Sequence, residues 1–428
     1  MRRFLIIAAL LLASCSARGG VVQTPVLHAG AARQNATSAI SHIVVIMLEN
    51  RSFDTYFGTY PGANGIPSNA PCNPDPVTGK CIFPYHDTVL NNYGGPHSTA
   101  DMIADIDGGK LDGFVASAEK YRTFDPNPAE VMGYHTAAEL PYYWSLANKY
   151  TLADNHFAAT SSWSTMAHLY MVSGWSAVCS VPGDPMSCVS SNTVNPQKNG
   201  DYAWTDLTWL LHAHGVSWGY YVFKSSLMEP NDGGDGEWQP AAPNFLSLWN
   251  PMPGFDDVRI DGQEQNVQKG ENFKAQALAG TLPAVSWVVP PFGSSDHPSV
   301  SVAAGQNWLR SQIDAVQSGP DWQSTVILVT WDEWGGFYDH VMPPVIDGQG
   351  FGFRTPLLVV GPMVKKGFID HQLLSSDAYL KLIEDTFLSG ERIDANDGRA
   401  DSRPDVRERT AGLGDLRNDF VGSTNAGQ

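Results

Sequence analysis

The sequence predicts an α/β protein built on a mostly parallel β-sheet. Two almost wholly apolar, β-branched runs at residues 43–48 and 326–331 are typical of strands buried on both faces of such a sheet. A helical pattern at 205–215 ends in glycine and leads directly into a strand pattern at 216–222. Helices that alternate with strands in this way indicate an α/β fold.

The N-terminal segment is predicted to be a targeting signal. Residues 1–14 have the form of a signal peptide, because a basic start precedes an apolar run at 4–13 that is too short to cross a bilayer. The sequence Leu-Ala-Ser-Cys ending at Cys15 resembles a bacterial lipoprotein box, in which Cys15 becomes lipidated. Ordinary cleavage nearby, with loss of Cys15, is the alternative. Small, polar residues at 15–38 then predict a flexible tether. The expected location is the periplasm or the cell envelope, or the protein is secreted.

The charge narrows the class of partners. The 428 residues carry a formal net charge of −18. Such an acidic surface argues against nucleic acid or an anionic membrane as the main partner. It favours neutral or zwitterionic substrates, or anionic ones drawn in by a local metal. Membrane association is expected only through a lipid anchor at Cys15.

The remaining four cysteines form two local pairs. In an oxidising compartment the simplest assignment is two disulfides, Cys72–Cys81 and Cys179–Cys188. Zinc is a poorer explanation, because neither pair has close ligand spacing.

The other elements are taken in chain order. Residues 39–420 are predicted to form a single domain, with a tail at 421–428. The stretch at 61–96 is rich in Pro, Asn and Gly and is expected to be a long ordered loop, and a polar excursion is expected at 230–264. Helices are predicted at residues 141–150, 165–173, 205–215, 306–317 and 377–388, and further strands at 216–222, 284–289 and 355–360.

Oxygen donors come after the two long apolar strands. Glu49 and Asn50 come directly after the first, and Asp332 and Glu333 come directly after the second. Ligands in open α/β sheets bind beyond the carboxyl ends of strands, so these groups indicate two sides of one metal site. For the first stretch, a polar N-cap at Asn50 or Ser52 that opens a helix is the alternative. An all-oxygen set favours Ca²⁺, Mg²⁺ or Mn²⁺ over Zn²⁺.

A hydroxyl-rich stretch leads into the helix predicted at 165–173. Ser164 would stand at its N-terminus, where backbone N–H groups and the helix dipole stabilise an alkoxide or a phosphate oxygen. A hydroxyl nucleophile for phosphoryl transfer belongs at such a place, although an N-cap serine is the commoner explanation. Residue type alone does not choose among the neighbouring hydroxyls, which are Thr160, Ser161, Ser162 and Thr165.

Three histidines lie near predicted turns or strand ends. His97 comes after a Gly-Gly-Pro turn, His297 after the strand at 284–289, and His340 after the second acidic strand end. Ordinary explanations also exist, because His97 can simply precede a helix that starts near Ser98, and His297 can be a loop residue.

Two motifs resemble a known family. LENRSFDTYFG, which begins at Leu48, and TWDEWGGFYDHVMPP, which begins at Thr330, are similar to signatures of the bacterial phosphoesterase family that holds certain phospholipases C and acid phosphatases. That family belongs to the alkaline phosphatase superfamily, and the resemblance covers roughly residues 40–420. It implies an alkaline phosphatase-like, three-layer α/β/α sandwich with a central mostly parallel sheet, and a single catalytic domain.

The resemblance also implies roles for individual residues. The family places its nucleophile nine residues before the Ser of a Ser-Gly pair, and counting back from Ser173-Gly174 gives Ser164. His97 and His297 become candidate catalytic residues, and His340 a candidate for substrate binding or for orienting the metal ligands. The implied metal ligands are Glu49, Asn50, Ser164, Asp332 and Glu333.

One departure affects the substrate. Many phospholipase-type members have Pro-Asn-Arg after the nucleophile, whereas this chain has Met166-Ala167-His168. The claim to a specific lipid headgroup is thereby weakened. The extra C-terminal domains of larger family phospholipases are also not found in the sequence, which again favours a broad phosphomonoesterase.

These observations predict an exported, metal-dependent phosphoric ester hydrolase with a serine nucleophile and a phosphoserine intermediate. Its expected substrates are phosphomonoesters or phospholipids, and a phosphatidylcholine-type phospholipase C is the alternative. Two other classes stay open. A glycoside hydrolase could use a carboxylate pair from Glu49, Asp332 and Glu333, but it would leave Ser164 without a role. A non-catalytic, metal-stabilised binding lipoprotein is the other.

Overall fold

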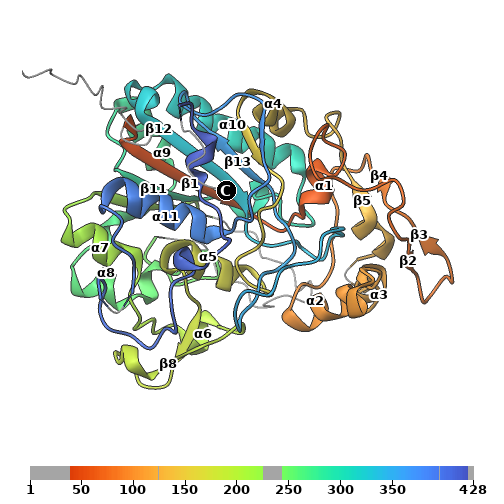
Figure 1. The fold of residues 1–428 in the computed structure, drawn as a ribbon, viewed down its shortest axis with the longest axis horizontal. Helices are drawn as coiled ribbons and strands as arrows, with labels where there is room; N and C mark the ends of the chain where they lie inside the picture. Colours follow the sequence, from red (N-terminus) through yellow and green to blue (C-terminus); the bar gives the residue numbers. More distant parts are fainter. Residues whose placement is uncertain (1–38, 124, 225–242, 395, 423–428) are drawn as a thin grey trace, which may run out of the picture. The chain divides into compact units, whose positions relative to one another are not determined.

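A central eight-stranded β-sheet organises the fold (Figure 1). β13 runs antiparallel to its two neighbours, and every other adjacent pair in the sheet is parallel. From edge to edge the strands are β10 (Val267–Lys269), β9 (Trp218–Val222), β11 (Val285–Val289), β1 (His42–Leu48), β12 (Thr325–Trp331), β13 (Leu357–Val360), β6 (Thr151–Ala153) and β14 (Phe368–Asp370). The predicted mostly parallel sheet is confirmed.

This computed structural model describes residues 39–123, 125–224, 243–394 and 396–422, which belong to one compact unit. The predicted signal peptide, tether and lipidated Cys15 lie outside the described residues. Within the described part of the chain, no helix has both the length and the apolar character that crossing a membrane requires.

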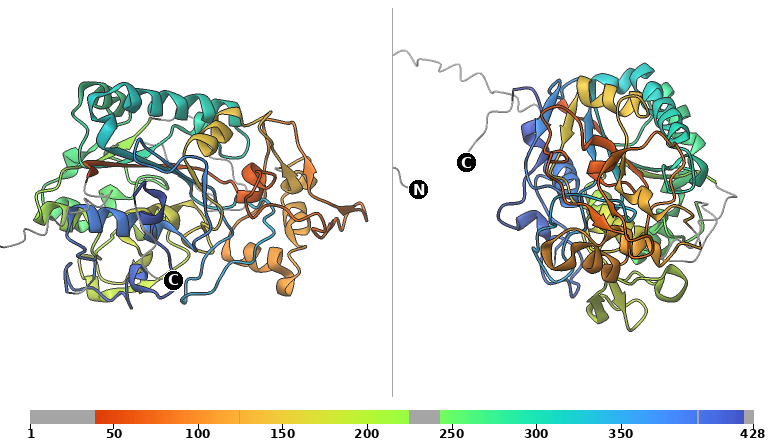
Figure 2. Two further views of the ribbon diagram at one scale, coloured as in Figure 1. Left: turned by 45° about the horizontal axis from the view of Figure 1, so that its top comes forward. Right: turned by 90° about the vertical axis from the view of Figure 1, so that its right-hand side faces the viewer.

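The two faces of the sheet bury different hydrophobic cores. Along β1, Val45 and Met47 contribute to one core, whereas Ile46 and Leu48 contribute to the other, as strand alternation requires. Figure 2 shows a helical layer on each side of the sheet. The first core is covered by α5 (Ser164–Ser173), α7 (Leu207–Ala213), α8 (Asp256–Ile260) and α11 (Ser376–Phe387), and the second by α1 (Phe53–Phe57), α4 (Pro141–Lys149), α9 (Glu271–Ala279) and α10 (Val302–Ser318). The three-layer α/β/α sandwich is therefore confirmed.

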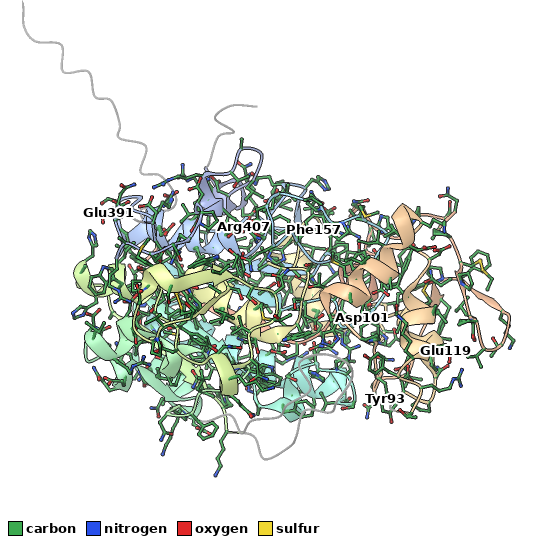
Figure 3. All side chains as sticks on the ribbon, turned by 90° about the horizontal axis from the view of Figure 1, so that it is seen from below. Tyr93, Asp101, Glu119, Phe157, Glu391 and Arg407 are labelled. Carbon is green, nitrogen blue, oxygen red and sulfur yellow. A yellow bond between two sulfur atoms is a disulfide. The ribbon has the colours of Figure 1, made fainter. Side chains whose placement is uncertain are left out.

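Smaller elements lie outside the three layers. A third, smaller core joins α3 to aromatic residues of the segment after β12, such as Trp334 and Tyr338. Figure 3 marks this region with Asp101 on α2 and Glu119 on α3. The additional elements are β2 (Asn73–Pro74), β3 (Cys81–Ile82), β4 (Tyr85–His86), α2 (Thr99–Ile106), α3 (Phe114–Glu119), β5 (Gly133–Tyr134), β7 (Ala177–Cys179), β8 (Cys188–Ser190) and α6 (Pro196–Asn199).

Both predicted disulfides are present. Cys72, which directly precedes β2, is bonded to Cys81 of β3, and Cys179 and Cys188 are directly opposite residues of the β7–β8 hairpin. Disulfides are typical of oxidising compartments, so this finding fits a protein that works outside the cytosol.

The predicted helices and strands are confirmed to within a few residues. The sheet strands β6, β10 and β14 were not predicted, because each has only three residues and shows no usable periodicity. The antiparallel direction of β13 was also missed, since direction depends on the path of the chain between strands.

Candidate active site

Glu49 and Asp332 stand side by side beyond the ends of two neighbouring parallel strands. Leu48 pairs with Trp331 in the register of β1 and β12, and the N–H of Asp332 donates to the Leu48 carbonyl at 3.0 Å. Because side chains alternate along a strand, Glu49 lies on the same face as Met47, which is the face that α5 covers. Both carboxylates are buried.

A sharp turn after each strand brings in a second polar residue. Asn50 has φ 57°, a left-handed conformation that Asn tolerates better than most residues, and its N–H donates to Asp332 Oδ1 at 2.8 Å. A Cβ added to Gly335, at φ 61°, would lie 2.5 Å from the Asn50 carbonyl oxygen, so this approach requires glycine. Glu333 accepts from the Gly335 N–H at 2.5 Å. Ser52 is the residue that caps α1, so Asn50 does not act as the helix cap.

Helix α5 presents its first residue to Glu49. Ser164 Oγ donates to Glu49 Oε2 at 3.1 Å, and both side chains are buried. The helix ends at Ser173, and Gly174 comes next with φ 61°, which is the glycine stop expected of a Ser-Gly pair.

The neighbouring hydroxyls have other surroundings. Ser161 and Ser162 donate to backbone carbonyls of nearby loops, at 3.1 and 2.7 Å. The hydroxyls of Thr160 and Thr165 are buried and have no hydrogen-bond partner among the described residues. Of these five residues, Ser164 is the one whose hydroxyl contacts a strand-end carboxylate.

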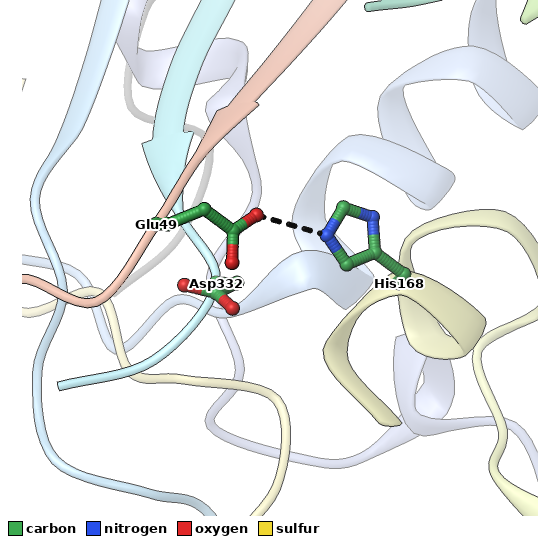
Figure 4. Close-up of side chains that lie close together, drawn as sticks. All are labelled: Glu49, His168 and Asp332. Carbon is green, nitrogen blue, oxygen red and sulfur yellow. Dashed lines mark hydrogen bonds and ion pairs between the residues drawn. The ribbon is translucent and has the colours of Figure 1, made fainter. Parts of the chain in front are cut away.

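His168 joins the site from the next turn of α5. It lies four residues after Ser164 and therefore on the same helix face, and its Nε2 is 3.2 Å from Glu49 Oε1. Figure 4 shows Glu49, His168 and Asp332 converging from α5 and the ends of β1 and β12. Burial lowers the pKa of His168 to about 4, so the imidazole is neutral at neutral pH. His168 was not among the predicted site residues, although its spacing from Ser164 was a usable signal.

The cluster fits a divalent cation. One ligand atom each of Glu49, His168 and Asp332 lie within 4.8 Å of one another. Asp332 Oδ2 and Asn50 Oδ1 are buried and have no hydrogen-bond partner among the described residues. Burying an unpaired charged or polar group is costly, and a bound cation would compensate both oxygens.

His97 reaches the site because its own Gly-Gly turn packs against the second motif. The Gly95 N–H donates to the Gly335 carbonyl at 2.8 Å. His97 Nδ1 donates to the Gly95 carbonyl at 2.9 Å, and Nε2 lies 3.4 Å from Asn50 Nδ2 and 3.6 Å from Glu333 Oε1. His97 also directly precedes the capped helix α2, as the alternative interpretation expected.

His297 is held near the same strand end. The Glu49 N–H donates to the Ser295 carbonyl at 2.9 Å, which ties the loop after β11 to the end of β1. His297 is buried, its Nδ1 donates to the carbonyl of the next residue at 2.9 Å, and its ring centroid lies 5.1 Å from that of Phe292 and 6.4 Å from that of Trp249.

The structure places His340 in a second cluster. Its Nδ1 lies 2.7 Å from Asp54 Oδ2. The buried Arg354 guanidinium pairs with Asp54 at 3.0 Å and with Asp339 at 2.9 Å, and so gives both carboxylates a shared counter-charge. The substrate-binding role of His340 stays a prediction.

A protein-family comparison matches this arrangement of motifs. The model of the Phosphoesterase family matches residues 40–388, which is most of the chain. The chain belongs to the phosphoesterase family. It is therefore a hydrolase that acts on phosphoric ester bonds, as the sequence predicted, and neither a glycoside hydrolase nor a non-catalytic binding protein.

Curated relatives of this phosphoesterase carry phospholipase names. The chain is 27% identical over 395 residues to Phospholipase C B of Mycobacterium tuberculosis, covering 81% of this chain and 73% of that protein. It is 25% identical over 401 residues to Non-hemolytic phospholipase C of Pseudomonas aeruginosa, covering 81% and 54%. It is 30% identical over 373 residues to Non-specific phospholipase C1 of Arabidopsis thaliana, covering 78% and 62%.

Solved structures resemble this phosphoesterase more distantly. Phosphonate monoester hydrolase of Agrobacterium radiobacter has a TM-score of 0.37 at 11% identity, covering 81% of this chain and 73% of that one. A protein of the alkaline phosphatase superfamily from Vibrio parahaemolyticus has a TM-score of 0.37 at 13% identity, covering 82% and 77%.

Proposed function

We propose that the chain is an exported, metal-dependent phosphoesterase in which Ser164 is the nucleophile. The observation that carries this proposal is the contact of 3.1 Å between Ser164 Oγ and Glu49 Oε2, at the N-terminus of α5. Glu49 is in place to accept the hydroxyl proton. The first-turn N–H groups and the dipole of α5 favour the negative oxygens of a phosphate group.

The reaction has two displacements at phosphorus. Ser164 Oγ attacks phosphorus, the bond to the alcohol oxygen breaks, and the serine proton passes to Glu49. Water then attacks the phosphoserine, which releases the phosphoryl product and restores the hydroxyl. A divalent cation held by Glu49, Asn50 and Asp332, with Ser164 and Glu333 as the other predicted ligands, would lower the pKa of the serine hydroxyl and neutralise a phosphate oxygen.

Two histidines complete the proposed machinery. His97 lies within 3.6 Å of Glu333, and His297 lies on the loop that is tied to the backbone of Glu49. Both are buried at the edge of the sheet where the phosphate would bind. We assign them to binding phosphoryl oxygens and to protonating the leaving oxygen.

The proposed substrates are phosphomonoesters and phospholipids. The relatives' names favour a phospholipase C, and the departure Met166-Ala167-His168 favours a broader phosphomonoesterase. The net charge of −18 disfavours nucleic acid as a substrate.

The test is hydrolysis of 4-nitrophenyl phosphate and phosphatidylcholine in parallel, with and without chelator. Wild type, Ser164→Ala and Ser162→Ala are compared, because Ser162 is a buried serine two residues away whose hydroxyl donates to a loop carbonyl. We expect chelator and Ser164→Ala to abolish turnover of the preferred substrate, while Ser162→Ala retains most of it. Full activity in Ser164→Ala would refute the nucleophile assignment.

The proposed export has its own test. Palmitate labelling of the full chain expressed in a bacterial host should mark the wild type and not Cys15→Ser. An unlabelled but exported wild type would support ordinary signal cleavage instead.

A further inference from the structure

The candidate metal site contains a nitrogen donor that the all-oxygen prediction lacked. Glu49, Asn50 and Asp332 offer oxygen atoms, and His168 places an imidazole in the same buried group. Hard cations such as Ca²⁺ and Mg²⁺ prefer oxygen ligands, whereas imidazole is a favoured ligand of several first-row transition metals. A role for His168 as a metal ligand rests on the proposed metal dependence of the enzyme.

The surroundings of His168 determine which ring nitrogen carries the proton. His168 Nδ1 lies 3.5 Å from the Tyr220 hydroxyl oxygen. Tyr220 donates its own proton to the Trp249 carbonyl at 2.6 Å, so towards His168 it can only accept. Imidazole binds a metal through one nitrogen and keeps a single N–H on the other, and Tyr220 is placed to accept that N–H from Nδ1. Nε2 then presents a lone pair to Glu49.

A lone pair that faces a carboxylate requires a positive charge between them. His168 Nε2 and Glu49 Oε1 are 3.2 Å apart. Two neighbouring ligands bound to one ion at about 2.0–2.2 Å stand about 3 Å apart, so this spacing is compatible with one shared ion. Asp332 Oδ2 and Asn50 Oδ1 are buried and have no hydrogen-bond partner among the described residues. An ion bound here would also coordinate these two oxygens.

We propose that His168 Nε2 is a metal ligand, and that it makes the site select a transition-metal dication such as Zn²⁺, Fe²⁺ or Co²⁺ over Ca²⁺ and Mg²⁺. Tyr220 holds the ring in the required tautomer and is a positioning residue. A hydrogen bond to the second nitrogen of a ligating histidine is the usual way in which proteins orient that ligand.

The test measures metal binding separately from turnover. Metal content of the purified full chain is measured by mass spectrometry. After chelation, the binding of Zn²⁺, Co²⁺, Ca²⁺ and Mg²⁺ is measured by calorimetry and by the shift in Tm, for wild type and for His168→Gln. The glutamine can still donate a hydrogen bond to Glu49, but it has no imidazole nitrogen. The visible spectrum of bound Co²⁺ reports directly on nitrogen ligation.

We expect wild type to prefer Zn²⁺ and Co²⁺. His168→Gln should lose at least about tenfold in affinity for these two ions, with Ca²⁺ and Mg²⁺ affinities little changed and an altered Co²⁺ spectrum. Equal losses for all four ions, or an unchanged spectrum, would show that His168 only donates a hydrogen bond to Glu49 and would overturn the proposal. Tyr220→Phe keeps the imidazole of His168. It provides a second test of the proposal if His168→Gln does not fold. It should weaken Zn²⁺ and Co²⁺ binding by about tenfold or more, and unchanged binding would count against the proposal.

Failure of the His168 assignment is distinguishable from failure of the proposed function. If Ca²⁺ or Mg²⁺ binds more tightly and restores hydrolysis, the phosphoesterase stays metal-dependent and the role of His168 is wrong. If the metal-free wild type hydrolyses its substrate at full rate, metal dependence itself is wrong.

Discussion

Two clusters of the same composition, each with two carboxylates and one histidine, differ in how their negative charge is balanced. The first cluster comprises Glu49, His168 and Asp332, and the second comprises Asp54, Asp339 and His340. In the second, Arg354 pairs with both carboxylates. In the first, Asp332 Oδ2 is buried without a hydrogen-bond partner among the described residues. Residue composition therefore does not distinguish a candidate metal site from a structural ion pair. The two are distinguished by whether the positive charge comes from a side chain of the protein or has to come from a bound ion.

The largest expected effect concerns the second cluster. Arg354→Met should lower the free energy of unfolding by about 3–5 kcal/mol, because it leaves Asp54 and Asp339 buried without a counter-charge. Chemical denaturation measures the loss. Arg354→Lys keeps the charge without the forked geometry and should lose less. If Arg354→Met were as stable as wild type, the second cluster would not be a stabilising ion pair.

The matching change in the first cluster should act on turnover instead. Asp332→Asn keeps an acceptor for the Asn50 N–H but removes a charge, so we expect kcat/KM to fall at least about a hundredfold. The Tm of the metal-free protein should stay the same or rise, because an uncompensated buried charge is gone. If Asp332→Asn lost stability and kept its activity, the two clusters would have the same role.

The buried carboxylate of Glu408 is a third case, because its negative charge is removed by protonation and not by a bound cation or an arginine. Glu408 has both carboxylate oxygens buried without a hydrogen-bond partner among the described residues, and burial, with Asp377 nearby, raises its pKa to about 7. The folded state therefore binds more protons than the unfolded state between about pH 4.5 and pH 7, so the stability contributed by protonated Glu408 is lost as pH rises through this range.

Removing this titration should alter the pH dependence of stability. Glu408→Gln should match wild type in Tm near pH 5 and exceed it by about 2–4 °C at pH 8. Thermal unfolding at the two pH values measures the difference. Parallel Tm curves for the two proteins would show that Glu408 does not titrate in this range.

The smallest expected effect is that of His340. Its contacts with Asp54 and Arg354 predict that His340→Gln costs about 1–2 kcal/mol of stability and leaves kcat within about threefold of wild type. Steady-state kinetics with the preferred substrate give kcat and KM for the variant and the wild type. A large rise in KM would instead support the substrate-binding role that the sequence predicted for His340.

The sequence was informative where one local pattern determined the structure. The apolar run before Glu49 predicted β1, and the helical spacing at 165–173 predicted that Ser164 stands at the start of α5. His168 was missed although it lies four residues after Ser164 and so shares its helix face. That this face of α5 meets the strand ends is set by packing against the sheet.

The second cluster could not be predicted for a related reason. Asp54 and Asp339 belong to the two motifs, whereas Arg354 lies on a segment with no recognisable pattern. Only the fold brings the guanidinium between the two carboxylates, so no local pattern separates His340 from the site residues.

Ser164 as the nucleophile is the central claim of the proposed mechanism. The decisive measurement is rapid acid quenching of the enzyme during turnover of its preferred substrate, followed by peptide mass spectrometry with fragmentation. We predict one phosphoryl group on Ser164 that decays as product forms and is absent from Ser164→Ala. A phosphoryl group on Thr165 or on another residue, or turnover with no covalent phosphoenzyme at any time point, would contradict this mechanism.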